Sequence, residues 1–242
     1  MNYKKCLTDA VLLADESAGE LSLIEELYSK SLREKEIDTR LLVRIKGVLE
    51  HLRSSLDFVA QGLSLKYAPQ NKRKVYFPYA KLDTDKETFL REKRIDKAVP
   101  GLSNRRPDIG ETILAMQHFS HPGAKWFPEF IELNNKNKHI HLVPHGLFRG
   151  VSLEFNGRKI IAEGISLGET GVIETDFGTL KGPLTITVEN ANEFDGYGIF
   201  RAEPWEAIFI EGYGFPLNSY EFVSHCVRAL SSVVKQFNQM VP

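Results

Sequence analysis

One long apolar stripe limits what this chain can fold into more than any other feature. Along residues 41–63 the stripe steps by three or four positions, through Leu41, Ile45, Val48, Leu52, Ser55, Val59 and Leu63. That spacing puts these side chains on one face of a continuous helix, which Asp38 or Thr39 can cap. Residues 8–36 repeat the helical pattern, with Gly19 as an interruption. The two helices are therefore expected to pack as an antiparallel hairpin.

The pattern is weaker from residue 67 onward. Two prolines interrupt the sequence after residue 67, and residues 75–77 are expected to be extended because the residue before a proline disfavours helix. Pro100-Gly101 and residues 105–108 mark turns. A short helix is expected at residues 86–99 and a longer one at 107–118, and another short helix is expected from Trp126 to the asparagine cluster that precedes His139.

The chain changes character after His141. Alternating apolar residues and glycine-rich turns predict strands, with Asn156-Gly157 as a two-residue hairpin turn and Pro204 on an edge strand. An amphipathic helix from Asn218 or Ser219 to Gln239 closes the chain.

The sequence therefore predicts an α+β fold. It consists of an N-terminal helical bundle in residues 1–145, followed by a small antiparallel β-sheet and a C-terminal helix in residues 146–242. The two parts can also form one integrated domain.

Charge is distributed unevenly along the chain. The net charge is −1, yet residues 66–106 hold 12 basic and 5 acidic residues, including Lys72, Arg73 and Lys74. A basic stretch of this kind can follow a phosphate backbone, because neutralising phosphates releases counterions. It can equally be a solvated surface that faces the acidic second half of the chain.

Composition limits the class of protein. With 42% hydrophobic and 26% charged residues, the 242-residue chain is typical of a globular protein, and it has no apolar run long enough for a membrane span. Without a signal peptide pattern it is expected to be cytoplasmic. Cys6 and Cys226 are expected to be buried thiols. The sequence indicates no cofactor. The long apolar stripe could also face a second subunit, so a homo-oligomer is an alternative.

Histidines cluster at the junction of the two parts. Five of the seven histidines lie between residues 118 and 145: His118, His121, His139, His141 and His145. No carboxylate spacing completes a metal site among them, so no metal is expected. His139 can instead act as an acid or base, with Lys136, Lys138 and Arg149 stabilising a phosphate, or it can be structural.

Two resemblances suggest what the helical part does. Arg44 and His51, two turns apart on one helix face, resemble the Arg-x(4–6)-His pair of the HEPN ribonucleases, helical bundles in which the pair cleaves RNA without metal. Separately, three segments in order resemble a group of uncharacterised bacterial proteins: LEHLRSSLDFVAQGL at 49–63, YFPYA at 76–80 and LNNKNKH at 133–139. That resemblance implies a role in bacterial stress or phage defence.

The resemblances supply the candidate residues. Arg53 and Asp57 are the helix positions of the second motif, and Asn135, Lys138 and His139 are its turn positions; Asp57 is expected to bond His139 if the two motifs meet.

The first hypothesis is a non-catalytic module that binds nucleic acid, a nucleotide or a partner protein through Asn135, Lys136, Lys138, Lys72, Arg73 and Lys74. The second hypothesis is a HEPN-like metal-independent ribonuclease or toxin. It would use His139 or His51 as acid or base and Arg44 or Arg53 to hold phosphate, with Asp57 in support.

Overall fold

The structure is a computed structural model of the whole chain. It describes residues 2–241 except 140–144 and seven stretches between residues 156 and 216, namely 156–157, 163–164, 168–171, 176–177, 182–183, 188–199 and 211–216. For Lys138, His139 and most strand residues the backbone alone is described. The chain divides into a helical unit (Met1–Ser29, Asp38–Pro144 and Ser219–Pro242) and a sheet unit (Lys30–Ile37 and His145–Asn218).

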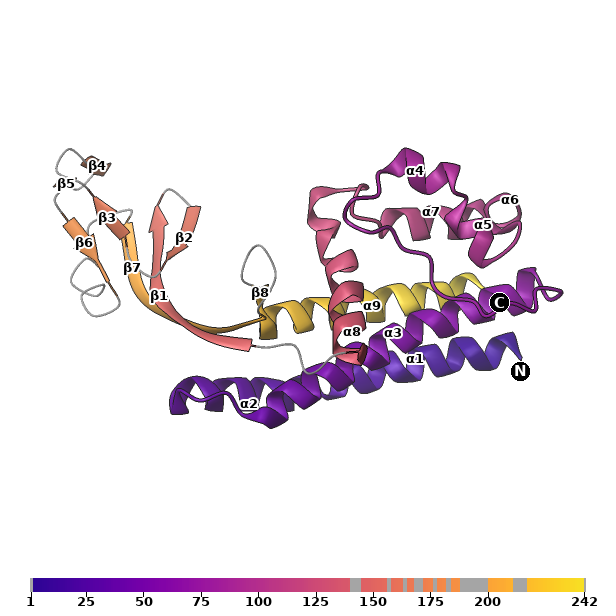
Figure 1. Cartoon of the computed structure of the whole chain (residues 1–242), viewed down its shortest axis with the longest axis horizontal. Coiled ribbons are helices and arrows are strands. Elements are labelled where there is room, and N and C mark those ends of the chain that lie inside the picture. Colours follow the sequence, from indigo (N-terminus) through magenta and orange to yellow (C-terminus); the bar gives the residue numbers. More distant parts are fainter. Residues whose placement is uncertain are drawn as a thin grey trace. The chain divides into compact units, whose positions relative to one another are not determined.

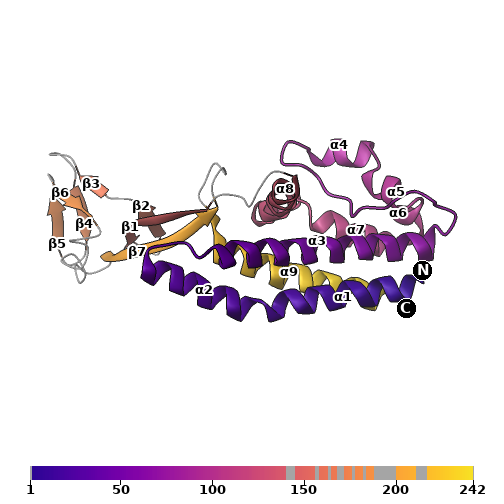
Figure 2. The ribbon, with the colours of Figure 1, turned by 60° about the horizontal axis from the view of Figure 1, so that its bottom comes forward.

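Long helices build the helical unit (Figures 1 and 2). Helices α1 (Tyr3–Gly19) and α2 (Leu21–Glu34) run one after the other, and α3 (Thr39–Tyr67) returns antiparallel to α1. Helix α9 (Ser219–Met240) packs against both α1 and α3. Its apolar face and the stripe on α3 bury against each other, which removes their apolar surface from water. The predicted helical hairpin is confirmed, and so is the α+β fold class.

Local sequence explains where these helices begin. The Asn2 side chain accepts a hydrogen bond from the Lys4 amide at 3.1 Å, and Asp38 accepts one from the Arg40 amide at 2.9 Å. Each bond satisfies a backbone donor that a helix start leaves without a partner. Helix α1 ends at Gly19, as the sequence predicted, and α2 begins two residues later.

Two glycines of α3 give a matched stability test. A Cβ at Gly62 would meet Leu7 side-chain atoms at 3.1 Å and the Tyr3 carbonyl at 3.3 Å, whereas a Cβ at Gly47 meets nothing within 4 Å. We expect Gly62→Ala to lower the free energy of unfolding by about 1–3 kcal/mol, because α1 and α3 must separate. Gly47→Ala should raise it by about 0.5–1 kcal/mol through helix propensity. Urea unfolding measures both changes in the free energy of unfolding. Changes of the same sign in the two variants would contradict the close packing of Gly62 against α1.

Short helices cover one side of the bundle. They are α4 (Lys86–Arg91), α5 (Arg94–Ala98), α6 (Leu102–Arg105) and α7 (Pro107–Ala115), followed by the 3₁₀ turn η1 (Pro122–Lys125) and α8 (Trp126–His139). Helix α8 crosses α3 and α9 at a steep angle (Figure 1).

Three sequence predictions in this region were wrong. The single helix expected at 86–99 is two, because Lys93 has a left-handed φ of 51°. The turn expected at residues 105–108 is reduced to Arg106, because α6 ends at Arg105 and α7 begins at Pro107. Helix α8 continues through the asparagine cluster, so Asn135, Lys138 and His139 lie on a helix rather than at a turn. Burial of Phe130, Ile131, Leu133, Asn134 and Asn137 explains the extension, since packing overrides weak propensity.

The segment between α3 and α4 is held without regular structure. Residues 75–81, which we call the Phe-Pro segment, form neither helix nor strand. Phe77 is buried, with its ring centroid 6.3 Å from that of Phe127 on α8 and 5.9 Å from that of Phe237 on α9. The segment is therefore anchored in the core by one aromatic side chain.

Strands form the sheet unit. The main sheet has the order β2-β1-β7-β8 and is antiparallel, with β1 at His145–Phe155, β2 at Arg158–Ala162, β7 at Phe200–Ile210 and β8 at Leu217–Asn218. Two smaller antiparallel pairs join β3 (Ile165–Leu167) to β6 (Leu184–Ile186) and β4 (Val172–Thr175) to β5 (Gly178–Lys181).

The main sheet agrees with two sequence signals. Phe155 pairs with Arg158, as a two-residue hairpin requires, although Asn156 and Gly157 themselves lie outside the described residues. Pro204 pairs with Val151 on a part of β7 that β8 does not reach, so among the described strands it lies on a local edge.

The division of the chain differs from the expected one at its C-terminal end. Strand β1 begins at the expected boundary, but α9 belongs to the helical unit and not to the sheet. Cys6 and Cys226 are buried free thiols, as predicted. No helix among the described residues is both long and apolar enough to cross a membrane.

Candidate functional site

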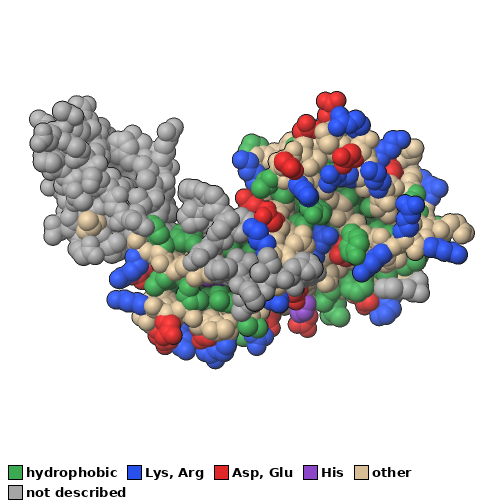
Figure 3. Space-filling view, viewed as in Figure 1, with side chains coloured by type: hydrophobic (Ala, Val, Ile, Leu, Met, Phe, Trp, Pro, Cys, Tyr) green, Lys and Arg blue, Asp and Glu red, His purple; other side chains and the backbone are tan. Residues whose placement is uncertain are grey.

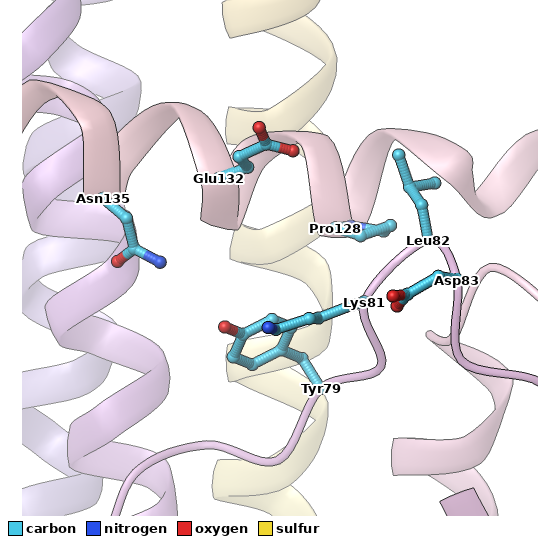
Figure 4. Close-up of a pocket in the computed structure, with 7 residues that line it drawn as sticks. All are labelled: Tyr79, Lys81, Leu82, Asp83, Pro128, Glu132 and Asn135. Atoms are coloured by element: carbon cyan, nitrogen blue, oxygen red, sulfur yellow. The ribbon is translucent and has the colours of Figure 1, made fainter. Parts of the chain in front are cut away.

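A cavity lies between the Phe-Pro segment and α8. It has a volume of about 350 Å³ and is lined by Tyr79, Lys81, Leu82, Asp83, Pro128, Glu132 and Asn135. In Figure 4 the Asn135 amide and the Asp83 carboxylate point into this space from its two ends, with Tyr79 and Lys81 between them. The cavity thus combines an aromatic ring with a cation, two carboxylates and an amide.

Tyr79 is fixed from three directions. The Arg53 guanidinium of α3 stands over its ring, with the guanidinium carbon 5.5 Å from the ring centroid. The Tyr79 carbonyl accepts a hydrogen bond from Arg94 at 3.1 Å, and the next amide, that of Ala80, donates to the buried Gln117 at 2.8 Å. The ring is therefore positioned before any ligand arrives.

Asp57 joins α3 to the Phe-Pro segment. Its Oδ1 accepts the Phe77 amide at 3.0 Å and lies 3.4 Å from an Arg53 nitrogen. The Arg53 side chain is only 9% exposed, so its charge depends on this carboxylate. Two of the three resemblance motifs, those at 49–63 and 76–80, therefore meet here, and Asn135 of the third lines the same cavity.

Two buried polar groups near the cavity are incompletely satisfied. Arg53 Nη1 and both amide atoms of Asn134 have no hydrogen-bond partner in the part of the chain that the structure describes. Asn134 is fully buried and precedes Asn135 on α8. A buried polar atom without a partner costs about 1–3 kcal/mol, so these three atoms are candidates for hydrogen bonds with groups outside the described residues.

The basic stretch separates into structural and exposed cations. Arg94, Arg105 and Arg106 donate to internal acceptors: the Tyr79 carbonyl, the Tyr67 carbonyl and the Met240 carbonyl. Figure 3 shows Lys and Arg side chains over α4 and α5, mixed with acidic ones at α4.

Lys72, Arg73 and Lys74 are instead exposed, and neither Lys72 nor Arg73 is within ion-pair distance of a described carboxylate. Tyr76 beside them is 52% exposed, and the Lys74 nitrogen lies 5.2 Å from its ring centroid. A hydrogen bond to Tyr76 raises the pKa of Lys74. We call residues 72–76 the basic segment.

A second concave site contains the HEPN-like pair. A groove of about 520 Å³ between α2 and α3 is lined by both Arg44 and His51, so the predicted shared face is observed. Arg44 Nη1 lies 3.0 and 3.1 Å from the two carboxylate oxygens of Glu20. This ion pair neutralises the guanidinium that was expected to hold phosphate.

The remaining predicted residues either form ion pairs with other residues or have side chains that the structure does not describe. Lys136 pairs with Glu132 at 2.9 Å, and Arg149 pairs with Glu206 at 2.6 Å across the sheet. Lys138 and His139 are in the last turn of α8, but their side chains are not described, so a contact between Asp57 and His139 stays a prediction. His141 also lies outside the described residues. Among those described, no three His, Cys, Asp or Glu side chains group as metal ligands.

The sequence reasoning missed several lining residues. Tyr79, Lys81 and Asp83 were not singled out, although Tyr79 lies in the YFPYA motif. Two aromatic residues flanking a proline in a basic stretch were the available signal. The stacking of Arg53 on Tyr79 joins distant parts of the chain and has no local signal.

Comparison with known proteins gives no family for this chain. No protein-family model matches it, and neither a curated protein nor a solved structure is significantly similar. Both resemblances noted from the sequence therefore stay predictions.

Proposed function

We propose that this protein is a non-catalytic module that binds single-stranded nucleic acid through the basic segment. The observation that carries the proposal is the combination of three exposed cations, at residues 72–74, with the exposed ring of Tyr76. Cations that follow the phosphates and aromatic rings on which bases stack are the two requirements for holding an unpaired strand. The setting in bacterial stress or phage defence is part of this proposal and is supported by the resemblance alone.

Anchoring of the segment supports this function. The Asp57 and Phe77 contacts hold the end of the basic segment against α3, while its cations point to solvent. A fixed backbone lowers the entropy lost when a strand is bound. A partner protein with an acidic surface would meet the same cations, but an exposed tyrosine beside them favours a ligand with bases.

Tyr76 gives the test of base stacking. We expect Tyr76→Ala to weaken binding of a fluorescent 12-nucleotide single-stranded RNA about tenfold, because stacking on an aromatic ring contributes roughly 1–3 kcal/mol per base. Tyr76→Phe keeps the ring and should bind like the original protein. Fluorescence anisotropy measures both affinities. Equal losses in the two variants would mean that the hydroxyl group, and not stacking, is involved.

The groove with Arg44 and His51 supports a second candidate, a metal-independent ribonuclease. The two side chains line one groove, as the HEPN-like arrangement requires. The ion pair between Arg44 and Glu20 makes the ribonuclease hypothesis testable, because Arg44 must break this pair before it can contact a phosphate.

If the groove cleaves RNA, His51→Ala should abolish cleavage of labelled RNA in EDTA. Glu20→Gln, which frees Arg44, should increase it severalfold. A gel of the products after incubation gives the answer. Cleavage that persists in His51→Ala would exclude this groove as its source.

A further inference from the structure

We infer that the cavity between the Phe-Pro segment and α8 binds one unpaired purine base that carries an exocyclic amino group, adenine being the simplest. The inference rests on the proposed function, because the base would belong to the same strand that the basic segment holds. Residues 72–76 lead directly into Tyr79 and Lys81 along the chain.

The ring of Tyr79 is the platform for this base. Arg53 covers the ring, and the Tyr79 carbonyl and the neighbouring Ala80 amide are tied by Arg94 and Gln117. The same ring lines the cavity. A purine stacks on such a ring over a larger area than a pyrimidine does, and stacking is the main source of affinity for unpaired bases.

The polar groups select the edge of the base. The Asn135 amide offers one donor and one acceptor, which can pair with the amino group and a ring nitrogen of adenine. The Asp83 carboxylate is an acceptor only, so it favours a base with an amino group over uracil, whose single edge donor, N3–H, lies between two carbonyl oxygens that repel a carboxylate. The Lys81 ammonium can meet the phosphate of the same nucleotide.

The size of the cavity fits one base. At about 350 Å³ it is at the lower end of the range of small-ligand sites, and Leu82 and Pro128 give it apolar walls. The unpartnered Arg53 Nη1 and Asn134 amide belong to residues next to this lining: Arg53 stands over the Tyr79 ring, and Asn134 precedes Asn135 on α8.

The test compares two RNA heptamers, all uridine and uridine with one central adenosine, by fluorescence anisotropy. The original protein should bind the adenosine heptamer about tenfold more tightly. Asp83→Asn, which replaces the acceptor-only carboxylate, should reduce the ratio to within about twofold. Asp15→Asn, the same change at an exposed site on α1, should leave the ratio unchanged. Tyr79→Leu should lower both affinities and also remove the preference, and Tyr79→Phe should keep it.

The outcomes separate this inference from the proposed function. Equal binding of the two heptamers, with binding still lost when the basic segment is reversed in charge, would overturn the base site and leave the function standing. If no oligonucleotide binds, the proposed function fails. Equilibrium dialysis with AMP and UMP then tests whether the cavity binds a free purine nucleotide. Preferential AMP binding that Asp83→Asn removes would support the site for a free nucleotide; equal or absent binding would overturn it.

Discussion

Replacing Asp57 by alanine is expected to lower the free energy of unfolding by about 2–4 kcal/mol. The substitution removes the acceptor of the Phe77 amide and leaves the Arg53 charge buried without its carboxylate. Breaking a buried pair from one side is costly because the other charge remains desolvated. Urea unfolding followed by circular dichroism gives the value.

Two variants control this experiment. Asp15→Ala removes an exposed ion pair with Lys235, 2.8 Å long with both side chains 51% exposed, and should change stability by less than about 1 kcal/mol. Asp57→Asn keeps an oxygen for the Phe77 amide and should lie between the two. If Asp57→Ala costs no more than Asp15→Ala, Asp57 does not secure the Phe-Pro segment.

Reversing the charge of the basic segment should have the largest effect on binding. We expect Lys72→Glu, Arg73→Glu and Lys74→Glu together to weaken binding of single-stranded RNA about 100-fold or more at low salt. The change removes three contacts to phosphate and adds repulsion, while the exposed side chains contribute little to folding. Anisotropy with the 12-nucleotide RNA measures the loss.

A second triple variant matches the change in net charge. Lys5, Lys46 and Lys235 each form an ion pair with a carboxylate on the helices, away from the basic segment in sequence. Replacing all three by glutamate should weaken binding less than about threefold. Similar losses in both triple variants would mean that net charge, and not this segment, determines the affinity.

The sequence predicted the helical hairpin because apolar residues that recur with a period near 3.6 over a long stretch are compatible with a helix and not with a strand. It failed at Lys93, where a lysine has a left-handed backbone that favours glycine or asparagine, and the helix divides there. It also ended α8 too early, because the burial of Asn134 and Asn137 depends on packing that local propensity does not contain.

The candidate site was predictable in parts. Charge counting identified Lys72, Arg73 and Lys74, and motif order singled out the segments that contain Arg53 and Tyr79. Their contact was not predictable, since it depends on how the Phe-Pro segment returns to α3. In the structure Arg53 stacks on a tyrosine and Asp57 accepts a backbone amide, while the bond expected between Asp57 and His139 stays a prediction.

The salt dependence of RNA binding tests the central claim most directly. If the three cations at residues 72–74 each neutralise one phosphate, log affinity should fall with log salt concentration with a slope of about −2, or roughly twentyfold between 50 and 200 mM salt. The triple charge-reversal variant should lose that slope together with its affinity. A slope near zero for the original protein, or no binding at 50 mM salt, would contradict the proposal that this segment holds a nucleic acid strand.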